Sequence, residues 1–550
     1  MGSGHILVYA FDVLIQLYVA EGFRERDAAV SILMNNLYGL DIDKRAFQLT
    51  YFALIMKGRQ YSRRILSKGI KPNVYAIPNN LEISEAELQL LHIDFPNQQK
   101  AQEDLLQLIN SFKNGADLGS LIEFKDIDFE NLKVGFGNGS ITFFDQMINE
   151  MIHVGELLQQ KYDVGITNPP YMGSSGMNKN LSNFIKKAYP DSKSDLFGVF
   201  IERLKKMIKS SGYYSMITQH AWMFLSSFEK LRHKINQQTI INMIHLGTRA
   251  FEEIGGEVVQ TTAFIMSPLE HKGHVGSYLR LVDFVNHGLK ETKSLEAIEK
   301  RNVDYLYQTV QDNFAKIPGQ PISYWVSENI LYSFKNDKNI GDYGVSRNGL
   351  QPKQTDRFVR QWFEVEKNNI NFGIINIEQT DTAEEKWFPY NKGGAKRKWY
   401  GNYDYVVNWY KNGHEIRNIK RNGKPYAVIP SQKYYFHESL TWPKITSGDI
   451  SLRYRISGSI PADAGNSTFF KSTQNLFYIL GLMNTKVGNY MLNLVNPTLN
   501  LQTSEFSSIP IKKIANKNEI ISISKHSIDI CKNDWDSFET SWDFDKHPLI

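Results

Sequence analysis

Cysteine is almost absent from this sequence, and its scarcity excludes several kinds of site. Cys531 is the single cysteine among 550 residues, so an internal disulfide and a cysteine-based zinc site are excluded. Scarce cysteine is typical of proteins from a reducing compartment, and we therefore expect a cytoplasmic location.

Long apolar runs and a large excess of one charge are also missing. No apolar stretch reaches the ~18 residues of a membrane-spanning helix, so we expect no membrane segment. Asp12 and Gln16 interrupt the apolar stretch 6–20, which favours a core helix over a signal peptide. The net charge of +5 permits an anionic partner. The histidines form no convincing pattern with carboxylates, and we expect no metal site. No nuclease-like cluster of acidic residues and lysine stands out either.

The first half of the chain alternates helical and strand patterns, which favours an α/β fold. Helices are expected at 5–20, 24–35 and 44–64, around a strand at 37–43. Residues 67–160 interrupt this alternation and are interpreted as an insertion, with helices at 84–112 and 143–161. The alternation then resumes with strands at 162–167, 212–220, 241–247 and 258–267, and helices at 195–210 and 226–238.

Composition changes in the second half. Residues 340–510 are rich in Asn, Gly, Tyr, Trp, Lys and Arg, with short strands and many turns. We therefore expect two domains in this long chain, an α/β domain over 1–335 and a mixed or β-rich domain over 336–550.

Two short motifs near the N-terminus are typical of a cofactor site. Gly2, Ser3 and Gly4 open a helix, where glycines allow a ligand to approach the backbone closely. Asp41 and Asp43 end the next strand, where a carboxylate can accept hydrogen bonds from ribose hydroxyls. Two aspartates after a strand are also common in solvated turns and helix caps.

The most specific motif is Asn168-Pro169-Pro170-Tyr171, directly after the apolar strand 162–167. Two prolines end the strand and stiffen the backbone. The Asn168 side-chain oxygen and the Pro169 carbonyl can then accept both hydrogens of a planar amine, and thereby localise its lone pair for methylation. Tyr171 offers a flat face for a base taken out of the duplex. The alternative is a strand that simply ends in a polyproline turn.

These motifs, in this order, resemble those of amino-group DNA methyltransferases. Residues 1–18, 38–61, 162–178, 386–409 and 496–511 resemble the PglX-like adenine-specific methyltransferases of BREX phage-defence systems, and type IIG restriction–modification enzymes are similar at a greater distance. The resemblance covers essentially the whole chain. It implies a Rossmann-like methyltransferase sheet with a helical insertion, followed by a DNA target-recognition domain. It also implies S-adenosyl-L-methionine as cofactor, N6 of a flipped-out adenine as substrate, and other phage-defence subunits as partners.

The resemblance assigns roles to particular residues. Gly2, Ser3, Gly4, Asp41 and Asp43 would bind the cofactor, and the tetrapeptide 168–171 would be catalytic. Asp195 and Phe197 match a helix that lines the pocket. Asp117 is our choice for the acidic residue that contacts the cofactor's adenine, and Asp126 is the rival.

The chain departs from the family pattern at its start. The family has a strand ending in Asp-Pro before the glycine turn, and Met1 stands where that motif is already half over. We therefore expect the first strand to be missing and the chain to be a fragment of a longer protein.

Basic and aromatic residues interleave in the second half, as in surfaces that bind nucleic acid. Residues 391–424 hold nine basic and two acidic residues, a local excess of +7. A solvated, loop-rich surface is the alternative. The candidates for binding double-stranded DNA are Arg347, Lys353, Arg357, Arg360, Lys396, Arg397, Lys398, Arg417 and Arg421.

Two other functions fit parts of this pattern. The absent first strand favours a DNA-recognition or assembly subunit without turnover. The tetrapeptide alone would also suit a methyltransferase acting on protein glutamine or RNA, but the long basic second half favours nucleic acid over a peptide.

Overall fold

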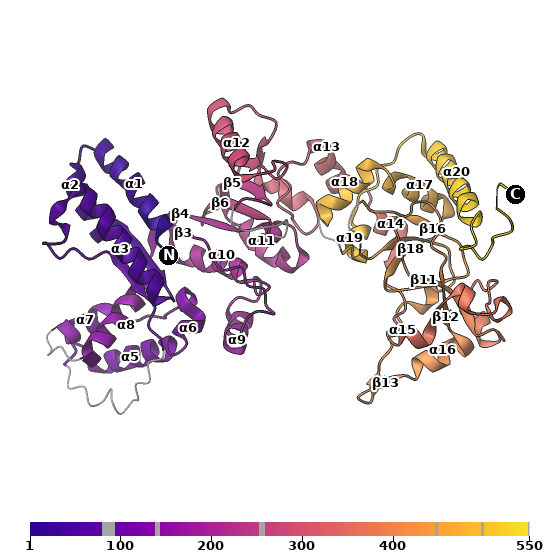
Figure 1. Ribbon diagram of the computed structural model, residues 1–550, viewed down its shortest axis with the longest axis horizontal. Helices are drawn as coiled ribbons and strands as arrows, with labels where there is room; N and C mark the ends of the chain where they lie inside the picture. Colours follow the sequence, from indigo (N-terminus) through magenta and orange to yellow (C-terminus); the bar gives the residue numbers. More distant parts are fainter. Residues whose placement is uncertain (80–93, 138–142, 252–258, 446–448, 497–499, 548) are drawn as a thin grey trace. The chain divides into compact units, whose positions relative to one another are not determined.

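The computed structural model describes residues 1–79, 94–137, 143–251, 259–445, 449–496, 500–547 and 549–550 (Figure 1). The chain divides into two compact units. The first comprises residues 1–222 and 230–311, and the second comprises residues 223–229 and 312–550. Residues 312–335, which the sequence analysis placed in the first domain, pack with the second unit.

The N-terminal part of the first unit has the predicted alternation of helix and strand. Helices α1 (His5–Ala20), α2 (Glu25–Ser31) and α3 (Lys44–Tyr61) pack with strands β1 (Tyr38–Asp41) and β2 (Asn73–Ala76). The two strands are parallel. Phe11, Leu33 and Leu54 are fully buried among these elements. The expected core helix is correct for one face of α1 only, because Phe11 and Ile15 are buried whereas Tyr9 and Leu17 are 73% and 57% exposed.

The insertion forms a helical subdomain with its own core. Its described helices are α5 (Gln98–Phe112), α6 (Gly115–Leu118), α7 (Phe129–Gly137) and α8 (Phe143–Gln159). Leu108, Phe112 and Ile152 lie in its apolar centre. The predicted helices at 84–112 and 143–161 correspond to α5 and α8, although residues 84–93 lie outside the described part of the chain.

A six-stranded mixed sheet forms the centre of the first unit, in the order β3-β4-β6-β5-β7-β8. The pairs β3–β4 and β5–β7 are parallel, and the other neighbouring strands are antiparallel. The strands are β3 (Tyr162–Thr167), β4 (Ile208–Gln219), β5 (Thr239–Gly247), β6 (Thr261–Ser267), β7 (Val275–Arg280) and β8 (Leu306–Val310). The helices that follow these strands in the chain are α9 (Lys179–Ala188), α10 (Leu196–Met207), α11 (Glu229–Ile235) and α12 (His287–Lys300).

Strands β1 and β2 form a separate two-stranded sheet. No ladder joins β1 to β3 among the described residues, but the Tyr38 ring packs edge-on against the Tyr162 ring, with centroids 5.4 Å apart. The two strands therefore begin close together. Val164 and Ile166 of β3 are 59% and 50% exposed. The α/β class is confirmed, with the described strands of this unit divided between two sheets.

A single buried arginine joins the insertion to helix α10. The Arg203 guanidinium donates to the carbonyls of Ser120 (2.7 Å), Ile122 (2.8 Å) and Leu158 (3.1 Å). One side chain thus accounts for the carbonyls of two residues that precede α7 in the chain and of one that follows it, in α8.

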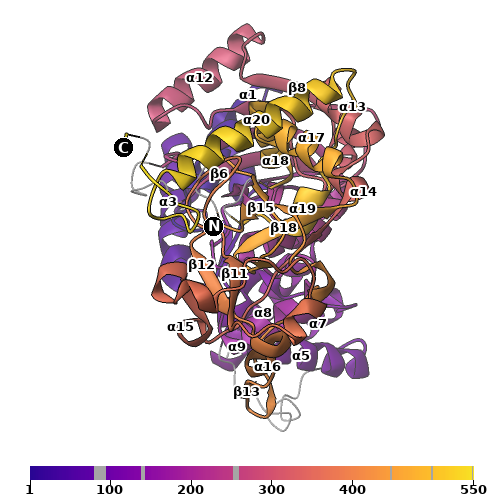
Figure 2. The ribbon, with the colours of Figure 1, turned by 90° about the vertical axis from the view of Figure 1, so that its right-hand side faces the viewer.

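The second unit combines two four-stranded sheets with helices. One sheet has the order β10-β12-β11-β17 and the other β16-β15-β18-β9. Helices α17 and α20 pack along one another (Figure 2). The strands are β9 (Gly344–Arg347), β10 (Val359–Gln361), β11 (Trp387–Asn391), β12 (Tyr405–Asn408), β15 (Ser439–Pro443), β16 (Arg453–Arg455), β17 (Ile460–Pro461) and β18 (Gly465–Phe470), with a hairpin of β13 (Lys420–Arg421) and β14 (Lys424–Pro425). The helices are α13 (Glu328–Asn336), α14 (Ile340–Tyr343), α15 (Thr355–Phe358), α16 (Tyr410–Arg417), α17 (Thr473–Met483), α18 (Lys486–Val495), α19 (Thr503–Ser507) and α20 (Lys517–Asp536).

None of the helices in the described part of the chain is long and apolar enough to span a bilayer.

Candidate functional site

The glycine motif and Asp41, which the sequence assigns to one cofactor site, lie together in the structure. Asp41 accepts a hydrogen bond from the Gly2 amide (2.7 Å) and lies 3.3 Å from the Met1 ammonium. Its second oxygen accepts from the Asp43 amide at 3.0 Å. The Asp41 carboxylate therefore holds the loop in place with three donors, and its remaining acceptor capacity is available to a ligand.

Both glycines of this loop have left-handed backbone angles, with φ of 58° at Gly2 and 89° at Gly4. A Cβ at Gly4 would come within 3.1 Å of the Thr50 backbone, whereas a Cβ at Gly2 would meet nothing within 4 Å. The Thr50 hydroxyl also donates to the Gly2 carbonyl at 3.0 Å. Gly4 is thus needed for packing, and Gly2 leaves an open face at the start of α1. An open backbone and a neighbouring carboxylate fit a ribose-bearing cofactor.

Asp43 has the helix-cap role that the sequence left open. Its side chain accepts from the Arg45 amide at 2.8 Å at the start of α3. Hydrogen bonds from Arg45 lower the pKa of Asp43. Asp43 thus stabilises the turn that holds Asp41.

The catalytic candidates follow β3 directly. Asn168 is exposed, Pro169 is buried, and Tyr171 is half-buried. Within the described residues, no protein group hydrogen-bonds the Asn168 side chain. Its amide oxygen therefore stands at the end of the strand, available to an external donor.

Helix α10 anchors the segment that follows the prolines. Asp195, the N-cap of α10, accepts from the Met172 amide at 3.0 Å and the Phe197 amide at 3.3 Å. The Leu196 amide donates back to the Met172 carbonyl. Burial raises the pKa of Asp195. The carboxylate thereby links the loop 168–173 to the helix, and Asp195 and Phe197 lie next to the segment that contains the tetrapeptide.

Tyr171 is positioned by its ring and its hydroxyl. The ring meets Phe197 edge-on, with centroids 6.2 Å apart, and the hydroxyl donates to the Ile217 carbonyl at 3.4 Å. Burial raises the pKa of Tyr171 to about 12, so the phenol is neutral at physiological pH.

Asp117, in the insertion, lies near the start of α9. It accepts from the side-chain amides of Asn178 (2.7 Å) and Asn180 (3.4 Å). Asn178 also caps α9, a few residues after the tetrapeptide 168–171. By contrast, the carbonyl of the rival Asp126 accepts from Lys100 of α5. Of the two, Asp117 has the contacts that join the insertion to the segment after the tetrapeptide.

The candidate DNA-binding residues all belong to the second unit, and each of the nine contacts another group of the protein. Arg357 pairs with Glu415 (3.2 Å), Lys396 with Asp449 (3.5 Å) and Arg397 with Asp534 (3.8 Å). The remaining candidates contact neutral groups: Arg347 lies over the Tyr434 ring, Lys353 donates to Gln351, Arg360 to the Asp356 and Val359 carbonyls, Lys398 to the Asn484 carbonyl, Arg417 to Asn412 and Gln432, and Arg421 to Tyr426. Sequence composition shows a local excess of positive charge and cannot reveal which cations are neutralised.

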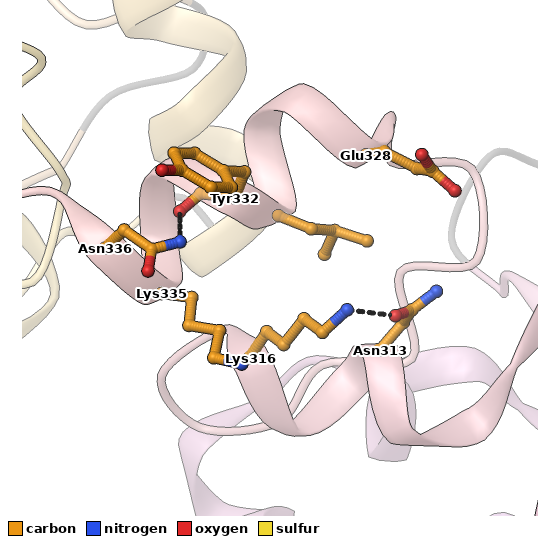
Figure 3. A pocket seen from close by; sticks show the side chains of 7 residues that line it. Asn313, Lys316, Glu328, Tyr332, Lys335 and Asn336 are labelled. Carbon is orange, nitrogen blue, oxygen red and sulfur yellow. Dashed lines mark hydrogen bonds between the residues drawn. The ribbon is translucent and has the colours of Figure 1, made fainter.

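An open hollow in the second unit lies between residues 313–316 and α13 (Figure 3). Lys316, Lys335, Glu328 and Tyr332 are among its lining side chains, and Lys316 donates to Asn313 at 2.6 Å. It contains none of the predicted site residues.

Two positioning residues were not found by sequence reasoning. Thr50 holds the Gly2 carbonyl from the middle of α3, and Arg203 joins the insertion to α10. Neither has a motif around it. An arginine on an otherwise apolar helix face, as at Arg203, is the one signal that the sequence offered.

The comparisons with known proteins agree with these observations. Residues 35–251 match the family of the Eco57I restriction-modification methylase. Along its whole length the chain is 41% identical to the adenine-specific methyltransferase PglX of Lacticaseibacillus casei (strain Zhang) and 36% identical to the adenine-specific methyltransferase BrxX of Escherichia coli O9:H4 (strain HS). It spans 46% of the length of each of these relatives.

A solved structure shares the fold at low sequence identity. The nuclease-deletion mutant of the Type ISP restriction-modification enzyme LlaGI, in complex with a DNA substrate mimic, matches with a TM-score of 0.51. The match covers 96% of this chain and 44% of that one, at 11% identity, and supports the fold alone.

Proposed function

The chain is homologous along its whole length to part of the adenine-specific methyltransferases PglX and BrxX, and from this relationship we propose that it is a site-specific DNA methyltransferase region. Its substrate is N6 of an adenine taken out of double-stranded DNA, and its cellular role is restriction–modification or BREX-type phage defence. The observation that carries the proposal is the exposed Asn168, held after β3 by two prolines, with no protein partner for its side chain among the described residues.

Residues 1–4 and Asp41 would hold S-adenosyl-L-methionine. The open face at Gly2 admits the cofactor to the start of α1, and Asp41 has acceptor capacity left for a ribose hydroxyl. Asp117 is the candidate for contact with the cofactor's adenine. The cofactor supplies the methyl group when it is bound.

The tetrapeptide would activate the target amine. The N6 lone pair of adenine is delocalised into its ring, which makes the amine a poor nucleophile. Asn168 accepts one N–H hydrogen through its side-chain oxygen, and the Pro169 carbonyl accepts the other. Because the prolines fix both acceptors before the base arrives, little reorganisation is required. Tyr171, neutral at physiological pH, stacks on the flipped base.

The second unit would bind the duplex. Its exposed arginines and lysines provide phosphate contacts, which supply much of the affinity of any protein for DNA.

The proposal is tested with the chain alone. The chain is incubated with labelled S-adenosyl-L-methionine and double-stranded DNA of varied sequence, and the product nucleosides are separated. Label in N6-methyladenine is the expected result. A folded chain that binds cofactor and DNA without transferring label would contradict the proposal and favour a recognition or assembly role without turnover.

A further inference from the structure

The hairpin of β13 and β14 is a short cationic ribbon. Lys420 pairs with Pro425 and Arg421 with Lys424, and Asn422 and Gly423 form the turn. Both turn residues have positive φ, 53° and 76°, which is the type I′ geometry that Asn-Gly favours. The turn is thus specified by the sequence itself.

The positive charge of this ribbon has no acidic counterpart. No aspartate or glutamate occurs anywhere in residues 416–437. In the described chain, neither Lys420 nor Lys424 forms an ion pair, and Arg421 donates to the Tyr426 hydroxyl (3.3 Å) while lying over its ring. Elsewhere in this unit, Arg357, Lys444 and Lys532 are paired with carboxylates. The hairpin is therefore a local region of uncompensated charge.

The hairpin adds little to the stability of the unit. All residues from Lys420 to Pro425 are exposed, and a Cβ at Gly423 would meet nothing within 4 Å. Figures 1 and 2 both show it extending from the unit beyond α16. Because an isolated two-stranded hairpin is only marginally stable in water, burial of its own surface does not explain this element.

We propose that the tip of this hairpin, residues 420–424, inserts into a groove of double-stranded DNA. A two-stranded ribbon fits the major groove, and β-ribbons are known readers of DNA. Lys420, Arg421 and Lys424 contact phosphates along the walls of the groove. Asn422, at the tip, places an amide that can both donate and accept at a base edge. The polar Asn-Gly tip has no apolar side chain to bury in a membrane. This inference rests on the proposed function and names the part of the protein that carries DNA recognition.

The first experiment measures the salt dependence of DNA binding. The full chain and the variant K420A/R421A/K424A are titrated with a duplex at several salt concentrations. The plot of log K against log salt concentration has a negative slope, and three phosphate contacts contribute about 2.7 to its magnitude. The magnitude of the slope should therefore be about 2 to 3 smaller for the variant than for the unaltered chain. Its affinity near ~0.15 M salt should fall at least about 10-fold.

A matched variant controls for the loss of net charge. K293A/K300A/K532A also removes three positive charges, but each of these lysines is paired with a carboxylate, Glu296 or Asp536. Its slope and affinity should stay close to those of the unaltered chain. Equal slopes for the hairpin variant and the unaltered chain, with both folded by circular dichroism, would overturn the inference. If the hairpin variant loses binding to polyglutamate and keeps its DNA binding, the partner is an acidic protein instead.

A second variant separates base contact from phosphate contact. N422A should leave the salt slope unchanged and reduce the preference among duplexes of different sequence. An unchanged preference would remove the base-edge contact from the inference. The proposed function fails in a different way: the unaltered chain would then bind DNA without transferring methyl groups, whatever the hairpin does.

Discussion

Replacing Asp195 by alanine tests whether helix α10 holds the loop 168–173, which contains the proposed catalytic tetrapeptide, in its geometry. Asp195 accepts from the Met172 amide and the Phe197 amide through one oxygen, and it is half-buried. Loss of the helix cap should cost about 1 kcal/mol. Loss of a hydrogen bond to a charged acceptor should cost about 1.5 kcal/mol or more at Met172. The total destabilisation of the loop and helix start is then about 2 to 3 kcal/mol.

Hydrogen exchange measures this effect at the amide concerned. A loss of about 1.4 kcal/mol corresponds to a tenfold change in an opening equilibrium. Loss of the hydrogen bond at Met172 alone should therefore make its amide exchange about 10-fold faster in D195A, and loss of the helix cap should add to this factor. Methyl transfer should fall more than cofactor binding. D195N retains an oxygen acceptor, and because burial already disfavours the charged form, its effect should be less than half as large.

A matched cap variant distinguishes loop anchoring from general destabilisation. Asn286 caps α12 and accepts from the Leu289 amide at 2.8 Å. This helix follows β7, which is not adjacent to β3 in the sheet. N286A should lose a similar cap energy without faster exchange at Met172. Unchanged exchange at Met172 in D195A would refute the anchoring role.

Three further perturbations have defined outcomes. G4A should lower the thermal midpoint and the cofactor affinity clearly more than G22A. Both glycines have left-handed φ (89° and 86°), but only a Cβ at Gly4 would meet neighbouring backbone. Equal effects of the two variants in calorimetry would contradict this. Burial lowers the pKa of His220 to about 4 and that of His245 well below 6.5. Between these values and the ordinary pKa of His, the unfolded chain binds more protons than the folded chain, so stability decreases as the pH is lowered. His220 alone should cost about 2 kcal/mol between pH 7.5 and pH 5 in urea denaturation, and a pH-independent midpoint would refute it. R203M leaves three carbonyls without their donor and should destabilise the insertion by about 2 kcal/mol or more, seen as faster amide exchange in α5 and α8 relative to β7.

The sequence predicted helices and strands well where the pattern of apolar residues and the flanking glycines or prolines indicate the same boundaries. The apolar stretch after Gly4 gives α1 at His5–Ala20, and two prolines end β3 at Thr167, both as expected. The glycine loop and Asp41 were predicted to act together, and a 2.7 Å hydrogen bond joins them. The helix and the strand end depend on neighbours in the chain, whereas the contact between Gly2 and Asp41 spans 39 residues and was expected only from the two motifs that belong to one kind of cofactor site.

Other features depend on contacts that sequence spacing does not encode. Asp195 reaches Met172 across 23 residues, and Arg203 reaches Ser120 across 83. The pairing of Arg397 with Asp534 likewise could not be found from the local charge excess. The hairpin at 420–425 is different, because the Asn-Gly pair between basic residues is a local signal for such a turn, whereas the charge count of residues 391–424 shows only its positive charge.

The most direct test of the account compares N168A with the unaltered chain. Methyl transfer to duplex DNA is measured as labelled N6-methyladenine, and cofactor and DNA binding are measured in parallel by calorimetry. Because Asn168 is exposed and unpartnered among the described residues, N168A should fold and bind both ligands as before while transfer falls at least about 100-fold. Transfer by N168A at the rate of the unaltered chain would contradict the central claim.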